Sequence, residues 1–340
     1  MRLKDNQLSD VDLATPLRIG SVAVRNRIVL APMSGVTDMP FRQLAWRHGA
    51  GLVVTEMVAS RELVNSTSES WARLQNAGFN PHMVQLAGRE AHWMAEAAKI
   101  AADNGADIID INMGCPAKKV IGGYSGSALM RDPDHALSLI EATVKAVDVP
   151  VTLKMRLGWD ENSINAPEIA RRAEEAGVQL VTIHGRTRMQ FYEGQADWNA
   201  IHAVRDVLSI PLVANGDVET VEDAHEILRR SGADAVMIGR GCQGRPWHAG
   251  VLAGAVAPEA WEIPGIATEH YRMMREFHGE SVAVRHARKH LGWYLERFAP
   301  GLAVSEKAAI MTSRDPLEVS ARFHDALMAA VSNAQTREAA

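Results

Sequence analysis

One pattern recurs three times along the chain: a helical segment ends in glycine, and a short apolar run follows it. The copies are NGADIIDINMG (104–114), AGVQLVTIHGR (176–186) and SGADAVMIGRG (231–241). Gly105, Gly177 and Gly232 suit the left-handed position that follows a helix. The apolar runs are too short for helices and lack a polar face, which is typical of strands buried in a parallel sheet.

Five further runs are predicted as strands: RIVLAPM (27–33), LVVTEM (52–57), HMVQLAG (82–88), VTLKMRLG (151–158) and PLVANGD (211–217). Amphipathic helical segments, such as 91–104 and 167–177, separate most of the eight strands. Eight strands alternating with helices predict a closed (β/α)₈ TIM barrel. An open doubly wound sheet is the alternative, but no GxGxxG follows the first strand.

The chain divides into two predicted domains. Residues 1–255 form the barrel, and 17–27 reads as a hairpin that plugs the barrel floor. Apolar residues at helical spacing predict a helical bundle over 256–335, which leaves 336–340 as a tail.

Composition limits the class of protein. Of 340 residues, 47% are hydrophobic and 23% charged, as in an ordinary globular chain. No apolar run reaches the ~18 residues that span a membrane, and the polar start lacks a secretion signal. We therefore expect a cytoplasmic protein with no membrane association. Without an extra apolar helix face, we expect a monomer, and the two cysteines are read as free thiols.

Polar residues and glycines gather where the predicted strands end, which is where TIM barrels carry their chemistry. Gly216 in ANGDV and Gly239 in IGRG follow the last two strands, where barrels often bind a phosphate through backbone N–H groups. Arg240 would add a positive charge there. The alternative is that these glycines only serve tight turns.

Lys154 and Arg156 lie two residues apart on one strand, so they face the same side. Charge inside a barrel is costly unless an anion or an electron-rich ring lies there. Lys154 is open to three interpretations: a Schiff-base amine, a cation beside a reduced flavin, or a lysine that reaches solvent at the barrel mouth.

Cys115 follows Gly114 and precedes Pro116, beyond the end of its strand. A free thiol is mostly protonated at neutral pH, which suits a proton donor. The alternative is a small buried apolar side chain. The glycine-rich residues that follow could move as a lid.

Taken together, the motifs APMSGVTDMPFR, TEMV, VQLAG, DINMGCPAKKVIGGYSGSALMRDP, LKMRLGW, IHGRT, ANGDV and IGRG resemble the tRNA-dihydrouridine synthases, most closely the bacterial B-type branch. The resemblance covers roughly residues 17 to 330, and the NMGCP block is its most specific part. It implies an FMN-dependent barrel whose helical domain helps to hold tRNA, with NADPH as reductant and no metal. The product would be 5,6-dihydrouridine.

The resemblance also implies roles for individual residues. The flavin ring would lie against Pro32, Met33 and Ser34, although many family members carry alanine in place of Ser34. The polar edge of the ring would bond to Gln85 and Lys154. Along the ribityl phosphate would lie His184, Asn215, Asp217, Gly239 and Arg240. Asn112 and Arg156 would hold a uracil flipped out of the RNA, and Cys115 would donate the proton that completes hydride addition.

A basic segment in the helical domain, RHARKHLGWYLERF (285–298), is the predicted RNA contact. Arg285, Arg288 and Lys289 share a helix face and could bind phosphates, while Trp293 and Tyr294 could pack or stack on bases. An ordinary solvated helix face is the alternative.

Three other functions remain open at this stage. An FMN barrel acting on a small molecule would need no basic helical domain. An RNA-binding module without chemistry would not need the set at Asn112, Cys115 and Lys154. An aldolase using Lys154 would leave Cys115 and Gln85 unexplained.

Overall fold

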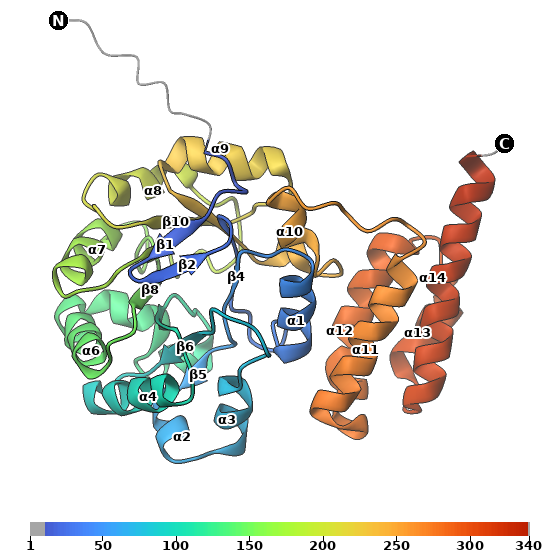
Figure 1. Cartoon of the computed structure of the whole chain (residues 1–340), viewed down its shortest axis with the longest axis horizontal. Helices are drawn as coiled ribbons and strands as arrows, with labels where there is room; N and C mark the ends of the chain where they lie inside the picture. Colours follow the sequence, from blue (N-terminus) through green and yellow to red (C-terminus); the bar gives the residue numbers. More distant parts are fainter. Residues whose placement is uncertain (1–10, 339–340) are drawn as a thin grey trace, which may run out of the picture.

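The computed structural model describes residues 11–338, and its larger part is a ring of parallel strands (Figure 1). The strands are β3 (Ile28–Leu30), β4 (Leu52–Val53), β5 (Val58–Ala59), β6 (Met83–Ala87), β7 (Ile108–Met113), β8 (Val151–Arg156), β9 (Val181–His184), β10 (Leu212–Asn215) and β11 (Ala235–Ile238). Their order in the sheet is β4-β3-β11-β10-β9-β8-β7-β6-β5.

The ring closes through the segment that the sequence predicted as one strand, 52–57. Here β4 pairs with β3, whereas β5 pairs with β6, and a parallel bridge joins Val54 to Met83 between them. The segment is therefore split because its two ends serve different neighbours. The closed ring confirms the predicted (β/α)₈ barrel.

Helices surround the ring, and most of them follow a strand. They are α1 (Met39–Arg47), α2 (Ser60–Val64), α3 (Ser68–Leu74), α4 (Ala91–Asp103), α5 (Lys118–Ile121), the 3₁₀ helix η1 (Gly126–Arg131), α6 (Pro133–Ala146), α7 (Ala166–Glu175), α8 (Trp198–Arg205), α9 (Val221–Ser231), the 3₁₀ helix η2 (Arg240–Cys242) and α10 (His248–Leu252). Gly105, Gly177 and Gly232 have φ angles of 85°, 105° and 67°, so the predicted left-handed turns after helices are confirmed.

A hairpin lies across the end of the barrel at which the strands begin (Figure 1). It consists of β1 (Leu17–Ile19) and β2 (Val22–Val24), which pair antiparallel. Leu17, Ile19 and Val24 are buried in one apolar cluster with Val213 and Met237 of the barrel strands. This end is closed by apolar packing, so the polar chemistry is confined to the opposite end.

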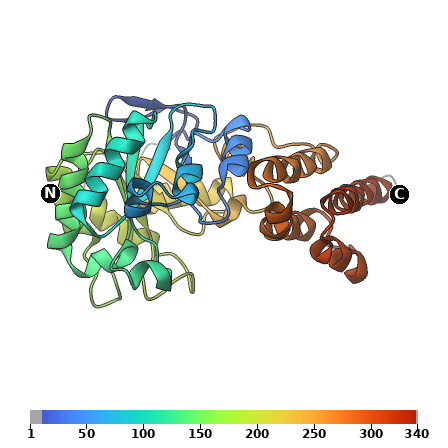
Figure 2. The same ribbon diagram turned by 90° about the horizontal axis from the view of Figure 1, so that it is seen from below.

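Four helices follow the barrel and stand beside it as a separate group (Figure 2). They are α11 (Ile263–His278), α12 (Glu280–Phe298), α13 (Val304–Thr312) and α14 (Pro316–Glu338). Tyr271, Leu291, Tyr294 and Phe323 are buried in their common core. The helix α14 includes residues 336–338 of the predicted tail, while residues 1–10 and 339–340 lie outside the described part of the chain.

The helical group contacts the barrel chiefly through α1. Asp38 accepts a hydrogen bond from the Phe41 amide as the N-cap of α1, and its other oxygen lies 2.8 Å from His278 Nε2 of α11. Arg47 and Glu269 form a further ion pair at 2.9 Å. Because Asp38 is 3% exposed, this contact is part of the interior of the molecule. Within residues 11–338, no helix is both long and apolar enough to cross a membrane.

Candidate active site at the barrel mouth

Strand register brings the predicted site residues together at the carboxyl ends of neighbouring strands. Asn112 of β7 lies beside Lys154 of β8, and Arg156 lies beside His184 of β9. His184 in turn lies beside Asn215 of β10. Side chains at paired positions of a sheet point to the same face, so these five form one continuous polar surface.

A chain of hydrogen bonds with fixed direction runs through the buried part of this surface. Thr152 Oγ1 and Gln85 Nε2 donate to the two oxygens of Asp110, at 2.6 and 2.7 Å. Gln85 Oε1 then accepts from Asn112 Nδ2 at 2.7 Å. Because a carboxylate only accepts, Asp110 fixes the orientation of the Gln85 amide and, through it, that of Asn112.

Cys115 is a half-buried residue that is held by its backbone. Asn112 Oδ1 accepts from the Cys115 amide at 3.0 Å, and Ser127 Oγ donates to the Cys115 carbonyl at 2.9 Å. A Cβ at Gly126 would lie 2.8 Å from that carbonyl oxygen, so only glycine fits there. Cys242 is fully buried, and burial raises the pKa of its thiol to about 12.

Lys154 and His184 share a crowded, positively charged environment. Lys154 Nζ lies 3.3 Å from Asn215 Oδ1; burial and the charge of Arg156 lower its pKa to about 8. Burial, together with Lys154 and Arg156, lowers the pKa of His184 well below its usual value. His184 is therefore neutral at physiological pH, and its Nε2 accepts from Arg186 Nη1 at 3.4 Å.

Arg156 is 1% exposed and ties the loop after β7 to the loop after β9. Its Nε donates to the Gly114 carbonyl at 2.8 Å, and its Nη1 donates to the carbonyls of Thr187 and Phe191 at 2.8 and 2.9 Å. These bonds occupy Nε and both protons of Nη1. Only Nη2 remains for a ligand.

Asp217 is the centre of a network that sequence reasoning did not predict. Arg186, which is 1% exposed, bonds both of its oxygens, at 2.8 and 2.5 Å, and Arg240 donates to it at 2.8 Å. Although burial opposes it, hydrogen bonding from Arg186 holds the pKa of Asp217 below its usual value. Asp217 thus positions two arginines. The spacing of Arg186 two residues after His184 was the available signal, as Asp110 before Asn112 was for the buried chain.

The loop after β3 adjoins the turn after β11. The Ala31 amide donates to the Ile238 carbonyl at 2.9 Å, and Met33 Sδ lies 3.4 Å from the position of a Cβ at Gly239. Met33 therefore lies beside Gly239 at the mouth, with Pro32 and Ser34 as its neighbours in the same loop, and Gly216 follows β10 in the next turn along the ring. Lys289 of the helical group reaches the same loop, because a Cβ at Gly35 would lie 2.8 Å from its Nζ.

The predicted RNA-binding face of α12 is partly available. Arg285 and Lys289 are exposed, while Arg288 is half-buried and its Nε is buried without a partner. Tyr294 is 1% exposed within the helical core, and Trp293 packs against the barrel core. The prediction that these two aromatic rings could pack is thus confirmed, but base stacking is wrong for Tyr294 because helical spacing alone does not say which neighbour covers a ring.

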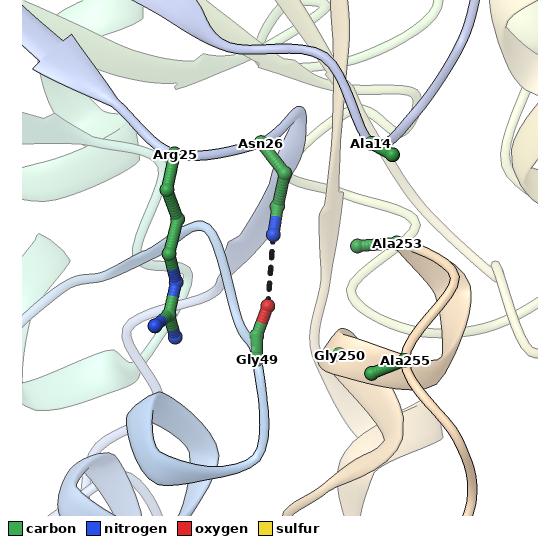
Figure 3. Close-up of a pocket in the computed structure, with 7 residues that line it drawn as sticks. All are labelled: Ala14, Arg25, Asn26, Gly49, Gly250, Ala253 and Ala255. Carbon is green, nitrogen blue, oxygen red and sulfur yellow. Dashed lines mark hydrogen bonds between the residues drawn. The ribbon is translucent and has the colours of Figure 1, made fainter.

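A cavity of about 230 Å³ lies at the other end of the barrel and takes no part in this site (Figure 3). Its lining includes Asn26 and Gly49, which precede β3 and β4, and Gly250 of α10. Asn26 Nδ2 donates to the Gly49 carbonyl at 2.8 Å across it. Arg25 is the one ionisable residue in the lining, and its Nε donates to the Ala50 carbonyl at 2.7 Å.

The sequence of this chain also matches proteins that are already known. The dihydrouridine synthase (Dus) family model matches residues 29–330. A probable tRNA-dihydrouridine synthase of Rhizobium leguminosarum bv. phaseoli is 83% identical, over 90% of this chain and 96% of the relative. The tRNA-dihydrouridine synthase B of Vibrio vulnificus (strain CMCP6) is 46% identical, over 82% and 89%.

Among solved structures, morphinone reductase superposes with a TM-score of 0.56 at 15% identity, over 75% of this chain and 92% of that one. At this identity the likeness concerns the barrel fold alone. The family model and the curated relatives confirm the resemblance that the motifs indicated. The chain therefore belongs to the tRNA-dihydrouridine synthase family and is an oxidoreductase.

Proposed function

We propose that this protein reduces specific uridines in tRNA to 5,6-dihydrouridine, with FMN as cofactor and NADPH as the source of electrons. The observation that carries the proposal is the thiol of the half-buried Cys115, held beside Asn112 at a mouth rich in positive charge. The names of the relatives support tRNA as the substrate.

The donor set at the mouth fits a flavin mononucleotide. Lys154, Arg156, Arg186 and Arg240 supply four positive charges, whereas Asp217 and the buried Asp110 supply the nearby carboxylates. This excess of positive charge suits a phosphate and an anionic reduced ring. The glycine turns at Gly216 and Gly239, together with Arg240, would hold the phosphate, with His184, Asn215 and the Arg186–Asp217 pair alongside.

The remaining cofactor contacts follow from the same surface. Pro32, Met33 and Ser34 would lie against the ring, and Gln85 and Lys154 would bond its polar edge. When bound and reduced, FMN supplies the hydride that adds to one carbon of the uracil 5,6 double bond. Lys154 offsets negative charge at this position, because its ammonium is held inside the mouth by Asn215.

The chain's own residues would orient the base and deliver the proton. Asn112 and the free Nη2 of Arg156 would bond the uracil edge. Cys115 Sγ would hold the proton and pass it to the second carbon of the double bond. The chain from Asp110 through Gln85 and Asn112 keeps the Cys115 backbone fixed during this transfer.

The helical group would hold the rest of the tRNA. Arg285, Arg288 and Lys289 lie on α12, and Lys289 reaches the loop at Gly35 beside the mouth. Phosphates bound along this face would be continuous with the site of chemistry.

The test of the proposed function is reconstitution. The purified protein should bind FMN and turn yellow. With NADPH, it should convert specific uridines to dihydrouridine in tRNA taken from cells that lack this chain. Mapping the modified positions by mass spectrometry would measure the outcome. A protein that refuses FMN, or tRNA that stays unmodified with the flavin bound, would contradict the proposal.

The pH dependence of stability offers a second check on the mouth. In cofactor-free protein the pKa of Lys154 is about 8, below its ordinary 10.5, so its charge destabilises the fold. As pH rises from 8 to 10.5, the folded state releases this proton before the unfolded state does, and stability increases. The unfolding free energy of the wild type should therefore increase relative to that of Lys154→Met over this range. Lys145→Met, at an exposed position on α6, is the control and should show no such trend.

A further inference from the structure

Arg188 is a buried cation without a counterion. It is 8% exposed, and its guanidinium carbon lies 4.9 Å from the centre of the Trp159 ring and 4.6 Å from that of Phe191. Its Nη1 donates to Met189 Sδ at 3.2 Å, while its Nε is buried without a partner. No carboxylate within residues 11–338 forms an ion pair with it.

This arrangement leaves a large cost uncompensated. Burying a charge without a partner costs far more free energy than contact with aromatic faces returns. A thioether sulfur is a weak acceptor and adds little. An anion that binds from outside would therefore gain more from Arg188 than from an ordinary surface arginine.

A second arginine without an ion pair in residues 11–338 contacts the same Trp159 ring. Arg131, the last residue of η1, also lies 4.9 Å from the centre of the Trp159 ring and is exposed. It too has no ion pair in the described chain. Two guanidinium groups on one indole repel each other unless an anion lies between or beside them.

Both arginines belong to the mouth. Arg156 holds the carbonyls of Thr187 and Phe191, which flank Arg188, and the Arg188 amide donates to the Gly158 carbonyl at 2.9 Å. Arg131 ends the segment in which Ser127 holds Cys115. Arg188 therefore lies in the loop after β9 that Arg156 holds, and Arg131 lies at the end of the segment that follows Cys115.

We infer that Arg131 and Arg188 form a subsite for a phosphodiester of the RNA strand, next to the nucleotide whose base enters the mouth. The planar guanidinium matches a phosphate with two parallel hydrogen bonds. A polyanion is favoured over a single phosphate because exposed Lys118 and Lys119 of α5, which lie between Cys115 and Arg131 in the chain, add further positive charge to this segment. This inference rests on the proposed function and names a part of its substrate site.

The experiment measures binding of unmodified tRNA to the FMN-loaded protein over a range of salt concentrations. Arg188→Met, which keeps an unbranched stem but removes the guanidinium, should weaken binding roughly tenfold at low salt. It should also reduce the slope of log K against log salt by about 0.7–0.9, as expected for one lost phosphate contact. Arg131→Met should act in the same direction, and Arg188→Lys should retain the salt slope.

Arg171→Met is the matched control, because Arg171 is an exposed arginine on α7. If Arg188→Met and Arg131→Met bind tRNA with the affinity and salt slope of this control, the subsite is wrong while the proposed function stands. A rise in the KM for NADPH but not NADH, with tRNA binding intact, would assign the anion to the dinucleotide and overturn the RNA assignment. Failure of the wild type to bind tRNA would overturn the proposed function itself. Should Arg188→Met not fold, Arg131→Met carries the same comparison.

Discussion

Replacing Cys115 by alanine is expected to lower the rate of uridine reduction by about 10²–10⁴-fold, the range for loss of a positioned general acid. The fold should remain, because the contacts that fix residue 115 are made by its backbone, to Asn112 and Ser127. The variant should therefore still bind FMN and consume NADPH. Single-turnover reduction of tRNA by the pre-reduced enzyme isolates the affected step.

Cys242→Ala supplies the comparison for this result. Cys242 is fully buried, and the pKa of its thiol is raised to about 12, so it cannot serve as the proton donor at the mouth. Its removal should leave tRNA reduction close to that of the wild type. Full activity in Cys115→Ala would show that another group or water supplies the proton, and the assignment of Cys115 would be wrong.

Arg186→Met is expected to have the largest effect on stability, about 3–5 kcal/mol in the free energy of unfolding. Arg186 is 1% exposed, and its loss would leave Asp217 with only Arg240 and the Ala196 amide, and would free the carbonyls of Glu193 and Gly194. Urea unfolding of the cofactor-free protein would measure the change.

The control for this variant is again Arg171→Met. Arg171 pairs with Glu175 on the surface, where such pairs contribute about 0–1 kcal/mol. If both arginine variants lost the same small free energy of unfolding, the Arg186–Asp217 pair would contribute no more to stability than a surface pair. A large loss of stability in Arg186→Met alone would show that the Arg186–Asp217 pair holds the turns after β9 and β10 together.

The barrel could be predicted from sequence because its information is local. Each helix–glycine–strand junction is written in a single short stretch of sequence, and Gly105, Gly177 and Gly232 have the expected conformation. The division of 52–57 could not be predicted, because it depends on which neighbours β4 and β5 find across the ring. That choice is made by ring closure, which no short stretch of sequence encodes.

The same distinction applies to the candidate site. The alternation of Lys154 and Arg156 was sufficient to place both at the mouth, and strand register then brought them beside Asn112 and His184. The bond from Arg186 to Asp217 joins residues on different turns, so it required the fold. Whether Tyr294 packs or stacks could not be decided from sequence for a related reason: its helix is buried on the side where the bundle packs.

The contact between Asp38 and His278 has a consequence for how this molecule can be divided. A carboxylate that is 3% exposed relies on a histidine some 240 positions further along the chain. Cutting the polypeptide at the linker would strip Asp38 of this partner and uncover Phe41, whose ring meets His270 and His290. The barrel produced without the helical group would therefore expose an apolar ring and an unpaired carboxylate to water. We expect it to aggregate rather than to fold as an independent domain.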